Sequence, residues 1–265
     1  MGVINVTPDS FSDGGRFLDA RAATAQGRRL AAEGAAILDV GGESTRPGAE
    51  PVAADQERER VVPVIAALAA DGVARLSVDT SKVEVARAAL DAGAGLVNDV
   101  TALRSAPDLA GLVADRGAEC CLMHMQGEPR TMQRDPRYDD VVAEVKAFLE
   151  ARLAFAVGEG VAEERVLLDP GIGFGKTIDH NLELLRRLGE LRELGRPICI
   201  GTSRKSFIGK ITGRDVDDRI GGTIASNVLA LAGGADVFRV HDVRAVREAL
   251  QVAEAVLEHS TAGGR

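Results

Sequence analysis

The stretch RLSVDTSKVEVARAALDAGAGLVNDV, residues 75–100, contains the unit from which the fold is predicted. A short apolar run, Leu76–Asp79, is followed by a segment of helical periodicity that ends near Gly93. Glycine readily adopts the left-handed backbone geometry that closes a helix. A second apolar run, Leu96–Val100, comes directly afterwards. The stretch therefore predicts a strand, a helix and a second strand in succession.

The same unit recurs along the whole chain. The predicted strands are Gly2–Val6, Ile37–Gly41, Leu76–Asp79, Leu96–Val100, Glu119–Met123, Val166–Asp169, Ile198–Thr202 and Val237–Val240. The helical segments between them end near Gly34, Gly72, Gly93, Gly117, Gly160, Gly195 and Gly234. A last helix is expected from about Val243 to Glu258. This alternation predicts an α/β fold, a (β/α)₈ TIM barrel formed by residues 1–258 as a single domain, with a frayed C-terminal tail at 259–265.

A doubly wound sheet is the alternative architecture. It usually carries a glycine-rich phosphate fingerprint after its first strand, and the segment Val6–Leu18 contains no GxGxxG. The connections that leave the predicted strands also include long segments, whereas those that enter them are short. The long segments are Thr7–Leu18, Gly42–Val52, Met125–Tyr138 and Gly171–Ile178. In a barrel they would lie at the C-terminal face, where active sites form.

Composition narrows the class of protein. The chain has 265 residues and a formal net charge of −8, which argues against non-specific binding of nucleic acid. No apolar run approaches the roughly 18 residues that a membrane span needs, and no signal-peptide pattern begins the chain. The three cysteines, Cys120, Cys121 and Cys199, show no disulfide or metal spacing and are interpreted as small buried hydrophobes. A cytoplasmic location without nucleic-acid or membrane partners is expected.

Polar side chains follow almost every predicted strand. In chain order they are Asn5, Asp39, Asp79, Asn98 with Asp99, His124, Asp169, Lys205, and Arg239 with His241. A single one of them would be a solvated strand end or a helix cap. A whole ring is different, because burying so many charges is costly unless they pair or meet a ligand. The ring predicts a ligand site at the C-terminal ends of the strands.

The residue types indicate what the ring would bind. Carboxylates and an amide at Asp79, Asn98 and Asp169 suit a flat heterocycle with N–H donors and a carbonyl, and Lys205 can donate to that carbonyl. Two cationic donors, Arg239 and His241, stand before the last helix and indicate an anion site. In the same region Asn5 can offer an amide oxygen to Mg²⁺.

Two glycine-rich loops add to the predicted site. The loop DPGIGFGK, residues 169–176, lets Phe174 approach a ligand, and GTSRKSFIG, residues 201–209, places Ser206 near a helix N-terminus. Neither loop fits GxxxxGK[ST], which argues against a nucleoside triphosphatase.

Seven segments together resemble the bacterial dihydropteroate synthases. They are GVINVTPDSFSDGG (2–15), GESTRPGA (42–49), NDV (98–100), LMHMQG (122–127), DPGIGFGKT (169–177), SRKSFIG (203–209) and RVHDV (239–243). The resemblance runs from Gly2 to about Val243. It implies a barrel enzyme of folate biosynthesis that joins 6-hydroxymethyl-7,8-dihydropterin pyrophosphate to p-aminobenzoate. The implied products are 7,8-dihydropteroate and pyrophosphate, Mg²⁺ is the implied cofactor, and a homodimer is the implied assembly.

The resemblance also implies a role for each matched residue. The implied pterin-binding residues are Asp79, Asn98, Met123, Asp169, Lys205 and Arg239. Those implied for pyrophosphate are Asn5, Arg46, Arg239 and His241, with Asn5 at the metal. Those implied for p-aminobenzoate are Thr45, Arg46, Pro47, Phe174, Lys205 and Ser206. Lys205, Arg239, His241, Asp13 and Arg46 would be catalytic. The pterin set is close to the heterocycle site expected from the residues alone.

The implied mechanism is mainly electrostatic. Pyrophosphate would leave ahead of amine attack, because the pterin ring delocalises the developing cation, which Asp13 would stabilise. The loops Thr7–Leu18 and Gly42–Val52 would close and exclude water. Sulfonamides would compete with p-aminobenzoate near Phe174.

Other interpretations remain open at several positions. Asp13 can instead cap its loop, Asp39 can belong to a structural network, and His124 can orient a loop. Asp99 and Asp242 suit strand ends or helix caps, and Lys205 can instead form a Schiff base. At the level of the whole protein, the alternatives are a pterin-dependent methyltransferase with a corrinoid partner and a paralogue that binds pterin without catalysis.

Overall fold

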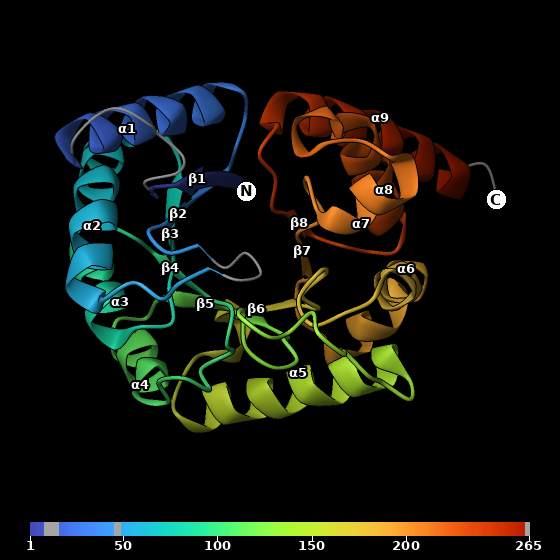
Figure 1. Ribbon diagram of the computed structural model, residues 1–265, viewed down its shortest axis with the longest axis horizontal. Coiled ribbons are helices and arrows are strands. Elements are labelled where there is room, and N and C mark those ends of the chain that lie inside the picture. The colour runs from blue at the N-terminus through green and yellow to red at the C-terminus, as the bar shows by residue number, and fades with distance from the viewer. Residues whose placement is uncertain (8–15, 45–48, 263–265) are drawn as a thin grey trace.

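The computed structural model describes residues 1–7, 16–44 and 49–262. Figure 1 shows strands gathered near the centre of the molecule and helices arranged around them. The elements alternate between strand and helix along almost the whole chain, as the repeated unit predicts. The loop residues 8–15 and 45–48, on which the expectations for Asp13, Thr45, Arg46 and Pro47 fall, lie outside the described residues.

The strands form a closed barrel. They are β1 (Gly2–Asn5), β2 (Ile37–Gly41), β3 (Arg75–Asp79), β4 (Leu96–Asp99), β5 (Glu119–Met123), β6 (Val166–Asp169), β7 (Cys199–Ile200) and β8 (Val237–Phe238). Strands β1 to β6 pair in parallel in chain order, and β7 pairs in parallel with β8. Parallel bridges join Gly2 to Val240 and Leu168 to Ile198, so the two sheets meet at both edges. The predicted (β/α)₈ barrel is confirmed.

Helices cover the outside of this barrel. They are α1 (Arg16–Ala32), α2 (Ala54–Asp71), α3 (Val83–Asp91), α4 (Asp108–Asp115), α5 (Val141–Gly158), α6 (Ile178–Arg186), α7 (Ser206–Thr212), α8 (Ile220–Ala232) and α9 (Val243–Ala262). Short 3₁₀ helices occupy Glu163–Arg165, Leu188–Leu194 and Val216–Asp218. Two helices, α7 and α8, stand between β7 and β8 where one was expected. Helix α9 continues beyond Glu258, its predicted end.

The glycines that predicted the helix ends adopt the expected geometry. Gly34, Gly72, Gly93, Gly117, Gly160, Gly195 and Gly234 all have positive φ, from 55° at Gly117 to 112° at Gly93. Residues with a Cβ rarely adopt this conformation, so these positions favour glycine. Among the helices of the described ranges, none is long and apolar enough to cross a membrane.

Alternate side chains along each strand point to opposite faces and so belong to two separate apolar clusters. Residues such as Ile4, Leu38 and Val78 are fully buried and belong to the large core that also contains helix residues. A smaller cluster contains Leu96, Cys121, Leu167 and Cys199, with Met1 and Val237 packed against it. Because side chains two residues apart share one face of a strand, polar residues that follow this small cluster also point into the barrel. This alternation positions the site.

Candidate active site

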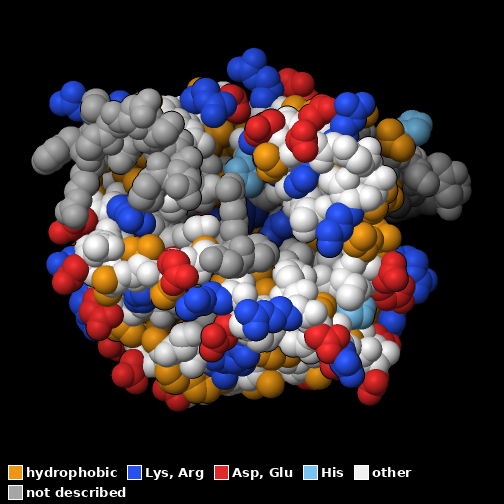
Figure 2. Space-filling view, viewed as in Figure 1, with side chains coloured by type: hydrophobic (Ala, Val, Ile, Leu, Met, Phe, Trp, Pro, Cys, Tyr) orange, Lys and Arg blue, Asp and Glu red, His pale blue; other side chains and the backbone are white. Residues whose placement is uncertain are grey.

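Predicted site residues from six strands or their loops surround one small cavity at the C-terminal ends of the strands. We call it the inner cavity; it has a volume of about 40 Å³. The predicted site residues that line it are Asp79, Asn98, Met123, Asp169, Phe174, Lys205, Arg239 and His241. A second cavity of about 410 Å³ adjoins it and shares Asp79 and Val100 with it. In Figure 2, blue Lys or Arg and pale-blue His side chains are visible around the central hollow of this face.

Arg239 crosses the barrel interior to two carboxylates. Its Nε lies 2.6 Å from Oδ2 of Asp39, and its Nη2 lies 2.7 Å from Oδ2 of Asp79. The amide of Asn98 donates to the same oxygen of Asp39, at 3.0 Å. Asp39 is fully buried and does not line the inner cavity. The structure therefore favours the interpretation of Asp39 as a network residue that holds Arg239 and Asn98.

The charges around the inner cavity are strongly affected by burial. Burial raises the pKa of Asp79 to about 7, although the charge of Arg239 opposes this rise. Burial and then the charge of Arg239 lower the pKa of Lys205 to about 8. Both groups can therefore change charge near neutral pH when a ligand enters, which is common at functional sites.

Asp169 combines a ligand-facing position with a fixed orientation. Its Oδ1 accepts the backbone N–H of Gly171 at 2.7 Å, and burial raises its pKa. Gly171 has a φ of 66°, and a Cβ there would lie 1.9 Å from the backbone oxygen of His124. The turn after β6 therefore requires glycine, and this turn orients the carboxylate.

His241 differs from its prediction as a cationic donor. Its Nδ1 lies 3.0 Å from the hydroxyl of Ser203. Burial and then the charge of Arg239 lower the pKa of His241 to about 4, so its imidazole is neutral at pH 7. The end of β8 therefore carries one cation, Arg239, rather than the two that the sequence suggested.

Comparisons with known proteins identify the family. The profile of pterin-binding enzymes matches residues 1–241. A dihydropteroate synthase of Synechocystis is 47% identical over 97% of this chain and 89% of its own length. The chain belongs to the dihydropteroate synthase family.

Solved structures of dihydropteroate synthases share the fold closely. The enzyme from Xanthomonas albilineans with 4-aminobenzoic acid is 51% identical, with a TM-score of 0.91 over 97% of this chain and 92% of its own. The enzyme from Yersinia pestis with a sulfonamide drug is 43% identical, with a TM-score of 0.92 over 97% of this chain and 94% of its own. These dihydropteroate synthases favour the synthase over the methyltransferase that the sequence left open.

Not every residue matched to the dihydropteroate synthase pattern lines the inner cavity. Asn5 ends β1 and is half-buried beside Gly41 of β2. Ser206 begins α7, is exposed, and lines neither cavity. Asp99 is fully buried and accepts hydrogen bonds from Thr101 and Leu103, so it holds its own loop and is neither a solvated strand end nor a helix cap.

Lys176 lines neither cavity but holds the loop that lines the inner one, a role that the sequence did not predict. Its side chain is only 3% exposed, and Nζ donates to the backbone oxygens of Gly171 and Phe174, both at 3.0 Å. It also lies 2.9 Å from Nδ1 of His124, whose pKa is lowered by burial and by Lys176 to about 2. Neutral His124 therefore accepts this bond, which fits its interpretation as a loop-orienting residue. In the sequence, the one indication of this role is that the glycine-rich loop 169–176 ends in a lysine.

Lys176→Met should change how stability depends on pH. Burial lowers the pKa of Lys176 from 10.5 to about 7, so between these values the unfolded chain binds more protons than the folded one. The free energy of unfolding of the wild type, relative to Lys176→Met, should therefore rise with pH from 7 towards 10, at up to about 1.4 kcal/mol per pH unit. Urea denaturation at several pH values measures it.

Lys210→Met, at an exposed position of α7, is the control for this experiment. Lys176→Met should also raise KM for p-aminobenzoate more than it lowers kcat, because Lys176 holds the backbone of Phe174. A stability difference that stays flat or falls with pH would show that Lys176 is not enclosed as described.

Proposed function

We propose that this chain forms 7,8-dihydropteroate from 6-hydroxymethyl-7,8-dihydropterin pyrophosphate and p-aminobenzoate, releasing pyrophosphate. The observation that carries the proposal is the convergence of two carboxylates, an amide and a lysine on the inner cavity, in a member of the dihydropteroate synthase family. A related synthase has been solved with 7,8-dihydropteroate, at 48% identity. The chain is a transferase of this kind, and the roles of its side chains are our assignment.

The pterin would occupy the inner cavity. Asp79 and Asp169 would accept its N–H groups, and Asn98 can both donate and accept. Met123 is buried beside Phe174, so it can pack on the flat ring. Arg239, which pairs with Asp39 and Asp79, lines the same cavity and can lie against the ring.

The p-aminobenzoate would lie on the outer side of Lys205. The Nζ of Lys205 is 4.0 Å from the centroid of the Phe174 ring, an arrangement that fixes both side chains. Ser206, exposed on α7, is available to a carboxylate that arrives from solvent. Thr45, Arg46 and Pro47 are assigned here from the family pattern, since they lie outside the described residues.

The pyrophosphate would lie near Asn5, Arg239 and His241, together with Arg46. An anion that draws the Arg239 side chain towards itself would weaken its pairing with Asp79. Asn5, half-buried at the end of β1, suits Mg²⁺ because an amide oxygen is a hard ligand. Bound Mg²⁺ would add positive charge to the leaving oxygens.

Catalysis by the chain itself is then mostly electrostatic. The C–O bond to pyrophosphate breaks with its electron pair on the leaving oxygen, where Arg239 offsets the new charge. The carboxylates of Asp79 and Asp169 stabilise the cation left on the pterin ring, with Asp13 assigned the same role from the family pattern. The arylamine nitrogen attacks the methylene carbon and then loses a proton to the released pyrophosphate, and closed loops would keep water from reacting first.

Pyrophosphate release tests the proposal. Purified protein given the pterin pyrophosphate, p-aminobenzoate and Mg²⁺ should release pyrophosphate at a rate that depends on p-aminobenzoate. Tight pterin binding without turnover would identify the non-catalytic paralogue instead. No binding of pterin at all would reject the assigned site.

Sulfonamides should inhibit this reaction competitively. The Phe174 ring and Lys205 lie together at the inner cavity, where a p-aminobenzoate mimic would meet both. We expect sulfonamide to raise the apparent KM for p-aminobenzoate and to leave the maximal rate unchanged. Initial rates across a grid of both concentrations measure this, and a fall in the maximal rate would argue for a different binding position.

A homodimer in the cytoplasm completes the proposal. Large exposed apolar side chains concentrate on α8 and α9, where Leu229, Val252 and Val256 are 64%, 67% and 64% exposed. Val252→Asp should therefore convert a dimer into a monomer in light scattering, whereas Val157→Asp on α5 should not. A dimer that survives Val252→Asp would locate the interface elsewhere.

The three cysteines are free thiols, which supports the cytoplasmic location.

A further inference from the structure

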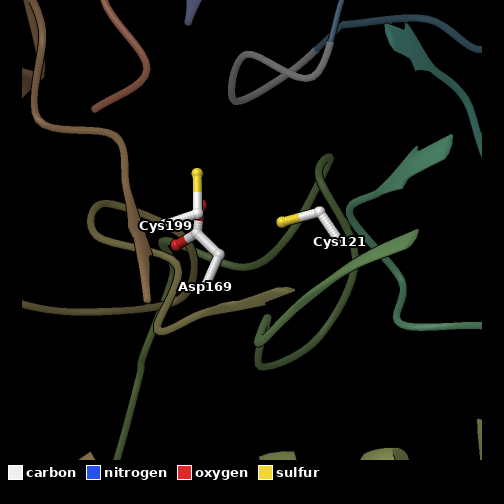
Figure 3. A group of neighbouring side chains, drawn as sticks. All are labelled: Cys121, Asp169 and Cys199. Carbon is white, nitrogen blue, oxygen red and sulfur yellow. The ribbon is translucent and has the colours of Figure 1, made fainter. Parts of the chain in front are cut away.

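Three potential metal ligands meet inside the barrel below the inner cavity. Cys121 on β5, Asp169 on β6 and Cys199 on β7 each offer one ligand atom, and these atoms all lie within 4.8 Å of one another. Figure 3 shows the Cys121 sulfur pointing towards Asp169 and Cys199. Cys121 and Cys199 are each 1% exposed and Asp169 is 6% exposed. We call these residues the thiol–carboxylate cluster.

The cluster is continuous with the inner cavity. Asp169 itself lines that cavity. Met123 and Gly201 also line it, and each stands two residues after a cysteine of the cluster on the same chain segment. Since side chains two residues apart share one face of a strand, the thiols lie directly behind the cavity wall. Because Asp169 belongs to both, an ion bound at the cluster would occupy a carboxylate that lines the cavity.

We propose that Cys121, Cys199 and Asp169 form a site for a thiophilic divalent cation such as Zn²⁺ or Cd²⁺, and that the bound ion excludes the pterin by taking Asp169. The second half rests on the proposed function, which assigns Asp169 to the pterin. Two thiolates and a carboxylate suit Zn²⁺ or Cd²⁺ and are unsuited to Mg²⁺, which prefers oxygen ligands. Each thiol releases its proton to solvent when it becomes a ligand.

The hydrogen bond with Cys199 and burial raise the pKa of the Cys121 thiol, so a bound ion must displace its proton; two features around the cluster would support such an ion. The backbone N–H of Gly171 holds one oxygen of Asp169, an outer contact that orients a ligating carboxylate. A divalent ion, two thiolates and one carboxylate carry a net charge of −1. Lys205 and Arg239 are close enough to affect Asp169 electrostatically and would offset that charge.

Cadmium titration of the full-length chain tests the site, because cadmium thiolates absorb in the ultraviolet. The protein is kept reduced with a phosphine. We expect one tightly bound Cd²⁺ with two thiolate bonds, and a loss of affinity of at least about ten-fold in Cys121→Ser and in Cys199→Ser. Cys120→Ser is the matched control, since Cys120 is buried on the same strand but belongs to the outer core.

Equal losses in Cys120→Ser and Cys199→Ser would overturn the site, as would cadmium absorption that survives Cys199→Ser. Cys199→Ala repeats the test if the serine variant does not fold. A cluster of buried cysteines that only fills space would bind no stoichiometric Cd²⁺, and this outcome also rejects the proposal.

Pteroate binding tests the competition. One equivalent of Cd²⁺ should lower the affinity for pteroate at least about ten-fold in the wild type and in Cys120→Ser, and leave it unchanged in Cys199→Ser. Unchanged pteroate affinity in a wild type loaded with Cd²⁺ would reject the competition. Failure of the metal-free protein to bind pteroate would reject the proposed function, while the cadmium absorption would still decide the metal site.

Discussion

Replacing Lys205 with alanine should lower kcat/KM for pyrophosphate release at least about 100-fold, a loss of about 2.7 kcal/mol of transition-state stabilisation. Lys205 is the N-cap residue of α7, and its Nζ lies over the Phe174 ring. It also lines the inner cavity with Asp169. One side chain thus lies between the assigned pterin and p-aminobenzoate positions, so its loss should affect both substrates. Kinetics with each substrate varied in turn measure the two effects.

The pH dependence of the reaction should follow the charge of Lys205. Burial and then Arg239 lower the pKa of Lys205 to about 8, so the positive form is present below that pH and is lost above it. If this charge meets the pterin carbonyl, kcat/KM of the wild type should fall above about pH 8. Lys205→Arg should remove this fall, because a guanidinium stays protonated there.

Lys210→Ala is the control for the loss of a lysine from α7, since Lys210 is exposed. It should retain wild-type kinetics. A loss below about ten-fold in Lys205→Ala would remove Lys205 from the site, and equal losses in both variants would indicate damage to α7. A fall above pH 8 that persists in Lys205→Arg would assign the titration to another group.

The barrel itself was predictable because its signals are local. Each strand is a short apolar run. A glycine precedes each strand from β2 to β8 because glycine adopts the left-handed conformation at a helix end with the least strain. Contacts across the barrel are harder to predict. Strands β7 and β8 are shorter than predicted, because single bridges replace continuous pairing at Val240 and Ile198. The second helix between these strands was also missed, since Arg214–Arg219 interrupts the helical pattern only briefly.

The candidate site was predictable as a set of residues but not as a set of interactions. The ring of polar strand ends included the side chains that converge on the inner cavity, but it also included four that do not line it: Asn5, Asp39, Asp99 and His124. The sequence could not show that Arg239 pairs with Asp39 and Asp79, because those partners lie 200 and 160 residues away. The role of Lys176 was missed for the same reason, because it depends on how the folded chain encloses the ammonium group. Charge pairing across a barrel is set by side-chain direction, which no single segment encodes.

Asp39→Ala should destabilise the protein by about 3–5 kcal/mol, the usual cost of breaking a buried ion pair by removing one partner. Asp39 is fully buried, and its Oδ2 receives hydrogen bonds from Arg239 at 2.6 Å and from Asn98 at 3.0 Å. The substitution leaves the Arg239 guanidinium with only Asp79 as a carboxylate partner. Urea denaturation measures the change in the free energy of unfolding. Asp71→Ala is the control, because its ion pair with Arg28 lies at the surface and should barely affect the denaturation midpoint.

The double variant Asp39→Ala with Arg239→Met identifies the cause of this loss. If the cost comes from a buried cation without its partner, removing Arg239 as well should restore part of the stability. Asp79 then loses its own partner, but it can remain protonated at pH 6 because burial raises its pKa to about 7. A double variant no more stable than Asp39→Ala would instead attribute the loss to the space that Asp39 fills. Recovery of stability would show that the role of Asp39 is to hold Arg239 at the inner cavity. The buried ion pair would then cost stability that an uncharged interior would not lose.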